Sequence, residues 1–168
     1  MSQLLKKTEM VANIAIVVVG ILLAVVLVKN YLLAKPQAPM PAAIAPGTKL
    51  SLPSVNWKAN GTTLVLALST GCRFCTESGP FYQRLAQERA KNQNIRLVAV
   101  FPQPVAEGQK YLSDLGVTVD EVQQARLDSI GVVATPTLIL ANADGAVLES
   151  WTGKLPGEKE SELLAKLK

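Results

Sequence analysis

Histidine is absent from this chain of 168 residues. A Ser–His–Asp triad, a Cys–His hydrolase pair and a histidine-ligated metal or haem all need an imidazole, so these sites are excluded. Cysteine is almost as scarce, because Cys72 and Cys75 are the only two. Two thiolates fill half of a tetrahedral zinc site, so zinc binding would require ligands from a second chain. We therefore expect no metal centre in the chain by itself.

An excess of charge of one sign is also missing from most of the chain. The formal net charge is +4, but Lys6, Lys7, Lys29 and Lys35 all lie before residue 36. From residue 36 onward, 13 basic residues stand against 12 acidic ones. Nucleic-acid binding needs a concentrated basic surface, so we expect this nearly neutral region not to bind nucleic acid.

No charge occurs in residues 10–28, MVANIAIVVVGILLAVVLV. As an α-helix this segment would span about 28 Å, close to the ~30 Å hydrocarbon core of a bilayer. Lys29 and Tyr31 follow, which is typical of an interfacial anchor. A cleaved signal peptide usually has a shorter apolar run, and a buried soluble helix usually keeps a polar face. With these two as the alternatives, the sequence predicts a transmembrane anchor within residues 1–35.

A spacer follows the anchor. Residues 36–46, PQAPMPAAIAP, are rich in proline and alanine and predict an extended, semi-rigid linker to a domain at residues 47–168. Lysines flank the apolar run on both sides, so the positive-inside rule gives only a slight preference. Because the long side chain of Lys29 can extend to the interface, we expect a cytoplasmic N-terminus. The domain would then lie on the extracytoplasmic side of a bacterial-type cytoplasmic membrane, held by a single span.

Apolar runs and helical patterns alternate along the predicted domain. In order, we expect a strand at 62–69, a helix at 72–91, a strand at 95–101, a helix at 105–115, a partly helical segment at 120–130, two strands within 135–151 and a last helix from 156. The pair Asp144-Gly145 joins the last two strands and is a hairpin signal. This order predicts an α/β domain with a central mixed sheet flanked by helices.

Both cysteines occur in STGCRFCTESGP, residues 69–80, after a predicted strand and at the start of a predicted helix. Unpaired N–H groups and the helix dipole would favour the thiolate of Cys72, and Arg73 would add to this if its charge points toward the sulfur. Cys75 would lie one turn deeper, from where it can attack a mixed disulfide. A structural disulfide would close a very short loop and gain little entropy. We therefore interpret the pair as a redox-active dithiol.

Three motifs resemble the thioredoxin fold: Cys72-Arg73-Phe74-Cys75, Pro80, and Thr135-Pro136-Thr137 before a strand. Gly153 after the last strand matches as well, and the long connection between residues 101 and 135 resembles the TlpA/ResA-like branch of membrane-anchored thiol–disulfide oxidoreductases. The resemblance covers about residues 47–168. It implies a thioredoxin-like fold with a helix kinked at Pro80 and a cis-proline at Pro136. It also implies that Cys72 and Cys75 are catalytic and form a redox-active disulfide without another cofactor. Thr135 and Pro136 would face the disulfide and bind substrate; a trans-proline that opens a strand is the alternative.

The chain departs from the family pattern near the cysteines. Gly71 replaces the usual tryptophan, and the positions of the buried acids in thioredoxin and in the ResA-like branch are Leu66 and Ser78. The nearest acid is Glu77, one position away. We expect the residues that tune the dithiol to be Arg73, Phe74 and Glu77.

The sequence favours an anchored dithiol that reduces disulfides in extracytoplasmic proteins and exchanges electrons with a membrane donor or acceptor. The same chemistry in the oxidising or isomerising direction is one alternative, since a stabilised thiolate makes the disulfide more oxidising. A peroxiredoxin-type peroxidase would need proline near Leu64 and threonine at position 69, where the chain has Ser69. A non-catalytic module that binds an extended chain beside Pro136 is the third alternative.

Overall fold

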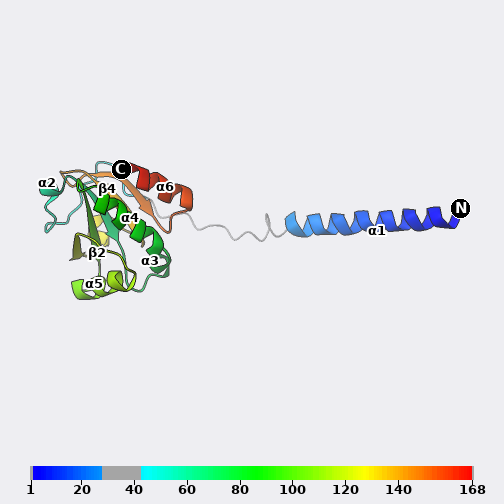
Figure 1. Ribbon diagram of the computed structural model, residues 1–168, viewed down its shortest axis with the longest axis horizontal. Coiled ribbons are helices and arrows are strands. Elements are labelled where there is room, and N and C mark those ends of the chain that lie inside the picture. Colours follow the sequence, from blue (N-terminus) through cyan, green and yellow to red (C-terminus); the bar gives the residue numbers. More distant parts are fainter. Residues whose placement is uncertain (1, 28–42, 168) are drawn as a thin grey trace. The chain divides into compact units, whose positions relative to one another are not determined.

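The computed structural model of the chain describes residues 2–27 and 43–167 (Figure 1). These residues belong to two compact units, of which the C-terminal one is the larger. The predicted linker, residues 36–46, lies mostly outside the described residues. Its extended conformation and the predicted domain boundaries therefore stay predictions.

The N-terminal unit contains one helix, α1 (Ser2–Leu27). Its large aliphatic side chains are half or more exposed wherever the structure describes them, at residues Ile16, Val17, Val18, Val19, Ile21, Leu22, Leu23, Val25, Val26 and Leu27. Within the described residues, no helix is both long enough and apolar enough to cross a membrane. The transmembrane anchor predicted from residues 10–28 is therefore not confirmed and stays a prediction.

The C-terminal unit is built on a mixed sheet of five strands in the order β3-β2-β1-β4-β5. The strands are β1 (Thr62–Ala67), β2 (Ile95–Phe101), β3 (Glu121–Gln124), β4 (Thr137–Ala141) and β5 (Val147–Thr152). β2 is parallel to β1 and β3, whereas β4 is antiparallel to β1 and β5. The predicted α/β domain with a central mixed sheet is confirmed.

One segment agrees with its prediction only in part. Residues 120–130 were expected to be partly helical, but Glu121–Gln124 form strand β3, which pairs in parallel with Val98–Phe101 of β2. Only the short 3₁₀ helix η2 (Asp128–Ile130) is helical in this segment. Pairing with the free edge of β2 satisfies the backbone of a polar segment whose side chains give no strand pattern.

Six helical segments accompany the sheet in the C-terminal unit. They are α2 (Trp57–Asn60), α3 (Arg73–Glu77), α4 (Gly79–Lys91), α5 (Val105–Asp114), η2 and α6 (Gly157–Lys166). The helix predicted for residues 72–91 is thus divided at Ser78. Pro80 has no N–H to donate to the carbonyl of Thr76, while the Ser78 hydroxyl donates to the Phe74 carbonyl at 2.8 Å. The break agrees with the kink that the family resemblance implied at Pro80.

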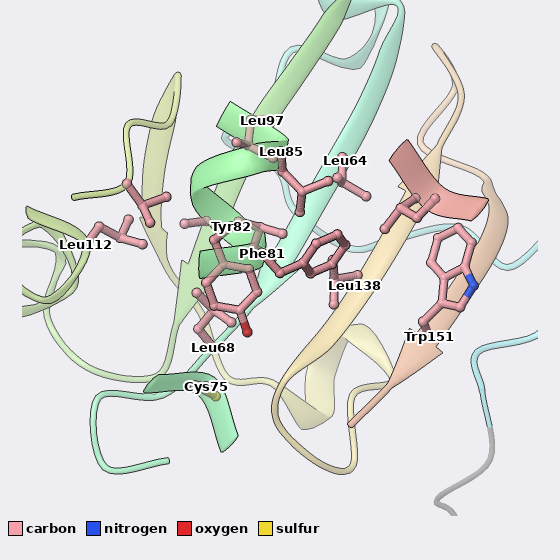
Figure 2. Packing of buried hydrophobic residues seen from close by; sticks show 14 of the residues in the cluster. Leu64, Leu68, Cys75, Phe81, Tyr82, Leu85, Leu97, Leu112, Leu138 and Trp151 are labelled. Carbon is pink, nitrogen blue, oxygen red and sulfur yellow. The ribbon is translucent and has the colours of Figure 1, made fainter. Parts of the chain in front are cut away.

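Buried apolar side chains cover both faces of the sheet, which explains the continuous apolar runs of β1 and β2. Alternate residues of each strand belong to different clusters: Leu64 and Leu66 of β1 join one, Val65 and Ala67 the other. The first cluster also contains buried residues of α4, α5 and α6, and Figure 2 shows its packing. Cys75 is fully buried in this cluster, so the sheet and α4 determine where one of the two thiols lies.

Candidate functional site

Cys72 is the residue that caps the N-terminus of α3. Its backbone is extended (φ −90°, ψ 110°), and the N–H of Cys75 donates to the Cys72 sulfur at 3.2 Å. The thiol of Cys72 in turn donates to the carbonyl of Thr135 at 3.3 Å. Both cysteines are free thiols, with Cys72 partly exposed and Cys75 buried. This geometry agrees with the sequence prediction that the first thiol begins the helix and the second lies deeper.

The two thiols have opposite acidities. Partial burial raises the pKa of Cys72, but hydrogen bonds from Cys75 and from the side chain of Thr135 outweigh it and hold the pKa below the ordinary value of a thiol. Burial, followed by the hydrogen bond with Cys72, raises the pKa of Cys75 to about 12. At neutral pH Cys72 is therefore the accessible thiol that ionises more readily, and Cys75 keeps its proton.

The Thr135–Pro136 segment lies against the dithiol although Thr135 is 63 positions from Cys72. The peptide bond between Thr135 and Pro136 is cis, so this part of the prediction is confirmed and the trans alternative is wrong. The Pro136 carbonyl accepts a hydrogen bond from the N–H of Gly153 at 2.7 Å, where φ is +86° and favours glycine. This bond ties the loop before β4 to the end of β5. Binding of substrate by Thr135 and Pro136 stays a prediction.

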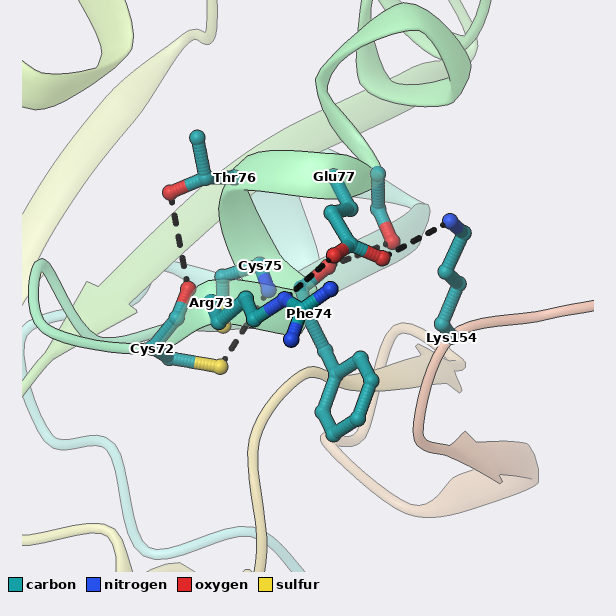
Figure 3. A network of polar contacts seen from close by, with 8 residues as sticks. Cys72, Arg73, Phe74, Cys75, Thr76, Glu77 and Lys154 are labelled. Carbon is teal, nitrogen blue, oxygen red and sulfur yellow. Dashed lines mark hydrogen bonds and ion pairs between the residues drawn. The ribbon is translucent and has the colours of Figure 1, made fainter.

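The charges of Arg73, Glu77 and Lys154 form a separate cluster on the surface. Arg73 Nε lies 2.7 Å from Glu77 Oε1, and Lys154 Nζ lies 3.0 Å from Glu77 Oε2; Figure 3 shows both cations meeting this carboxylate. Lys154, followed by Arg73, holds the pKa of Glu77 below its ordinary value. The side chain of Arg73 is 85% exposed and pairs with Glu77. Arg73 would favour the Cys72 thiolate only if its charge pointed toward the sulfur. The described contacts do not support that orientation.

Apolar side chains are exposed near the dithiol. Phe74, between the two cysteines, is 54% exposed, and Val133, two residues before Thr135, is 73% exposed. Large apolar side chains in such positions suit a surface that contacts another chain. The ring of Phe74 is thus available to contact another chain, and its predicted tuning role stays a prediction.

Several polar contacts around the cysteines were not predicted from the sequence. The backbone of Ser69 and the side chain of Thr135 both lower the pKa of Cys75, although less than burial raises it. Thr76 Oγ1 lies 3.0 Å from the Tyr111 hydroxyl and links α3 to α5. Tyr82 of α4 is buried in the same cluster as Cys75. The only signal for Tyr82 in the sequence was its spacing of seven residues from Cys75, about two helical turns.

No protein-family model matches the chain, and no curated protein matches it either. Solved structures do match. A thiol:disulfide interchange protein from Bacteroides sp. aligns with a TM-score of 0.54 and 20% identity over 76% of this chain and 86% of the other. StoA from Bacillus subtilis aligns with a TM-score of 0.52 and 14% identity, over 78% of this chain and 100% of the other. A thiol-disulfide isomerase from Corynebacterium glutamicum aligns with a TM-score of 0.54 and 14% identity, over 79% of this chain and 97% of the other.

These likenesses cover 76–79% of this chain and 86–100% of each neighbour. At such low identity they establish the fold and leave the activity to be argued from the site. The chain therefore has a thioredoxin-like α/β fold of the kind found in bacterial thiol:disulfide interchange proteins.

Proposed function

We propose that this protein is a thiol–disulfide oxidoreductase of the TlpA/ResA type whose working group is the Cys72–Cys75 dithiol. The observation that carries the proposal is the asymmetry of the pair. Cys72 is accessible and has a lowered pKa, whereas Cys75 is buried and has a raised one. An enzyme of this class needs one thiol that attacks the substrate disulfide and a second that stays protonated until the mixed disulfide has formed. A structural pair of cysteines needs no difference in exposure or pKa.

The reaction follows from this difference in two steps. The thiolate of Cys72 attacks a substrate disulfide, forms a mixed disulfide and releases the first substrate thiolate, which takes up a proton. The thiol of Cys75 then loses its proton and attacks the Cys72 sulfur, so that the Cys72–Cys75 disulfide forms and the second substrate thiol leaves. The substrate gains two electrons and two protons from the dithiol. An external thiol donor must then reduce the protein again.

We propose that the protein works in the reducing direction on disulfide-containing proteins. The groups that lower the pKa of Cys72 are neutral, namely the thiol and N–H of Cys75, the Thr135 side chain and the Phe74 backbone. The nearby cation, Arg73, is paired with Glu77. Without a cation on the thiolate, its stabilisation is modest, and a modestly stabilised thiolate makes a weak oxidant. Oxidation or isomerisation is the alternative, and a measured reduction potential separates the two.

The substrate-binding part of the proposal uses the Thr135–Pro136 segment and the exposed side chain of Phe74. The Thr135 carbonyl is within hydrogen-bonding distance of the Cys72 sulfur, so a chain that pairs with the Thr135 backbone would bring its own disulfide to Cys72. Phe74 and Val133 would cover apolar side chains next to that disulfide.

Membrane attachment is also part of the proposal. The exposed aliphatic side chains of α1 need an apolar cover, and a lipid bilayer supplies one. We infer that residues 10–28 anchor the chain and that the thioredoxin-like domain works outside the cytoplasm, where it receives electrons from a membrane partner. Thiol pairs in that compartment need such a dedicated donor.

The experiment that tests the activity is reduction of insulin disulfides driven by dithiothreitol. We expect the wild-type protein to accelerate the reaction and Cys72→Ser to abolish the acceleration, because Cys72 is the attacking thiol. A wild-type protein that binds reduced or unfolded chains but never accelerates disulfide reduction would instead be a non-catalytic binding module.

A further inference from the structure

The hydroxyl of Tyr82 is buried in the core without a hydrogen-bond partner among the described residues. Tyr82 is 0% exposed, and its oxygen is one of four buried side-chain atoms in this condition. A buried hydroxyl without a partner costs free energy relative to a phenylalanine of the same shape. Such a group calls for an explanation, and use in another state of the protein is one.

The position of Tyr82 indicates which state that is. Tyr82 and Cys75 belong to the same buried cluster, and Figure 2 shows the Tyr82 oxygen directed toward the part of the core where Leu68 and Cys75 lie. Burial, followed by the negative charge that Cys75 can carry, holds the pKa of Tyr82 far above its ordinary value, although the side chain of Ser78 partly lowers it. Tyr82 therefore keeps its proton and can act toward the sulfur only as a donor.

Cys75 needs a donor at one stage of the proposed reaction. To attack the mixed disulfide on Cys72 it must become a thiolate inside an apolar cluster, although its pKa in the dithiol is about 12. No carboxylate is buried among the described residues, so a buried acid is not available to take its proton or to shift its ionisation. The backbone of Ser69 and the side chain of Thr135 give partial help.

Other hydroxyls near the dithiol are already engaged. The Ser78 hydroxyl donates to the Phe74 carbonyl at 2.8 Å, and the hydroxyls of Thr76 and Tyr111 lie 3.0 Å from each other. The Tyr82 hydroxyl has no such well-formed hydrogen bond among the described residues, although the side chain of Ser78 is near enough to lower its pKa.

We propose that the Tyr82 hydroxyl donates a hydrogen bond to the Cys75 thiolate during the resolving step and so positions and stabilises the attacking sulfur. The proposal rests on the oxidoreductase function proposed above. In this step the Cys75–H bond breaks, the Cys75 sulfur bonds to the Cys72 sulfur, and the bond from Cys72 to the substrate sulfur breaks. The departing substrate thiolate takes up the proton that Cys75 lost. Tyr82 keeps its own proton, and no further reactant is needed.

The test uses Tyr82→Phe in the full chain, with Tyr111→Phe as the matched control. Each reduced protein is mixed with one equivalent of dithiobis-nitrobenzoate, and the coloured thiolate is followed over a range of pH. Attack by Cys72 releases the first equivalent, and attack by Cys75 on the mixed disulfide releases the second. The two steps proposed for the two thiols are therefore measured as two phases of one trace.

The expected effect is confined to the second phase. Loss of one hydrogen bond to a thiolate raises its pKa by about one unit, which reduces the thiolate population about tenfold at every pH below the pKa. The more basic thiolate is about threefold more nucleophilic, so Tyr82→Phe slows the second phase roughly threefold. The first phase, and both phases of Tyr111→Phe, keep the wild-type rates. Because phenylalanine removes a buried hydroxyl without a partner, Tyr82→Phe unfolds at the same urea concentration as wild type or a higher one.

Three results would overturn the proposal. If the second phase of Tyr82→Phe is as fast as that of wild type, or if Tyr111→Phe slows it equally, the Tyr82 hydroxyl has no special role at Cys75. A wild-type protein that releases no second equivalent overturns the oxidoreductase function itself, and the role of Tyr82 with it.

Discussion

Thr135→Val tests how the acidity of Cys72 is set, because valine keeps the shape of threonine and removes only the hydroxyl. The Thr135 side chain is one of the groups that hold the pKa of Cys72 below its ordinary value. A hydrogen bond to a charged group contributes about 1.5–3 kcal/mol, and one pKa unit corresponds to about 1.4 kcal/mol. Water can replace part of that bond because Cys72 is partly exposed. We therefore expect the pKa of Cys72 to rise by about one unit.

The sign of the effect on the reduction potential follows from the same bond. Above the pKa of Cys72 the dithiol contains the thiolate, so the hydrogen bond stabilises the reduced protein and makes its disulfide easier to reduce. Without the hydroxyl the potential becomes more negative, by roughly 30 mV for a change of 1.4 kcal/mol. Below the wild-type pKa the thiol is protonated in both proteins, and the difference disappears.

The pKa is measured from thiolate absorbance in the ultraviolet against pH, and the potential from equilibrium with a glutathione buffer. Cys75 does not interfere near neutral pH because its pKa is about 12. Thr135→Ser, which keeps the hydroxyl, is the control and should titrate close to wild type. An unchanged pKa in Thr135→Val, or an equal rise in both variants, would refute the argument that this hydroxyl acts on the sulfur.

Three further predictions concern other parts of the chain. Arg73→Ala should leave the pKa of Cys72 within about 0.3 unit of wild type, because an exposed charge paired with Glu77 is screened; a rise near one unit in the same titration would contradict this. Cys75→Ser should accumulate mixed disulfides between Cys72 and partner proteins, seen by non-reducing electrophoresis and mass spectrometry; recovery of none would count against exchange on Cys72. The full chain should fractionate with membranes and a chain beginning at residue 43 should not; equal solubility of the two would contradict an anchor in residues 10–28.

Much of the fold could be predicted because the central strands are buried on both faces. Residues 95–101 form β2 with the bounds expected, and the strand expected at 62–69 is β1, two residues shorter. β3 could not be predicted in this way. Its sequence, Glu-Val-Gln-Gln, has no apolar run, and only Gln123 is buried, because an edge strand is held mainly by its backbone pairing with β2.

The parts of the candidate site that depend on residue type and spacing could be predicted from the sequence. The contacts that depend on the direction of a side chain could not. Cys72, Cys75 and the cis bond before Pro136 followed from motifs. The direction of Arg73 was available from a weaker signal, since Glu77 is four residues further on and such pairs meet on a helix. The expectation that Arg73 tunes the dithiol gave that spacing too little weight.

Tyr82 marks the limit of what the sequence reveals. On an apolar helix face a tyrosine is expected to contribute its ring to the core, and the ring does so. Whether the hydroxyl finds a partner depends on every element packed around it, so its isolation beside Cys75 becomes apparent only in the folded domain. The main groups that oppose burial at the two sulfurs are neutral hydrogen-bond donors, while the charges of Arg73, Glu77 and Lys154 satisfy one another at the surface. Neutral donors stabilise a thiolate without drawing a counter-charge into the core, which allows Cys75 to ionise briefly before it bonds to the Cys72 sulfur.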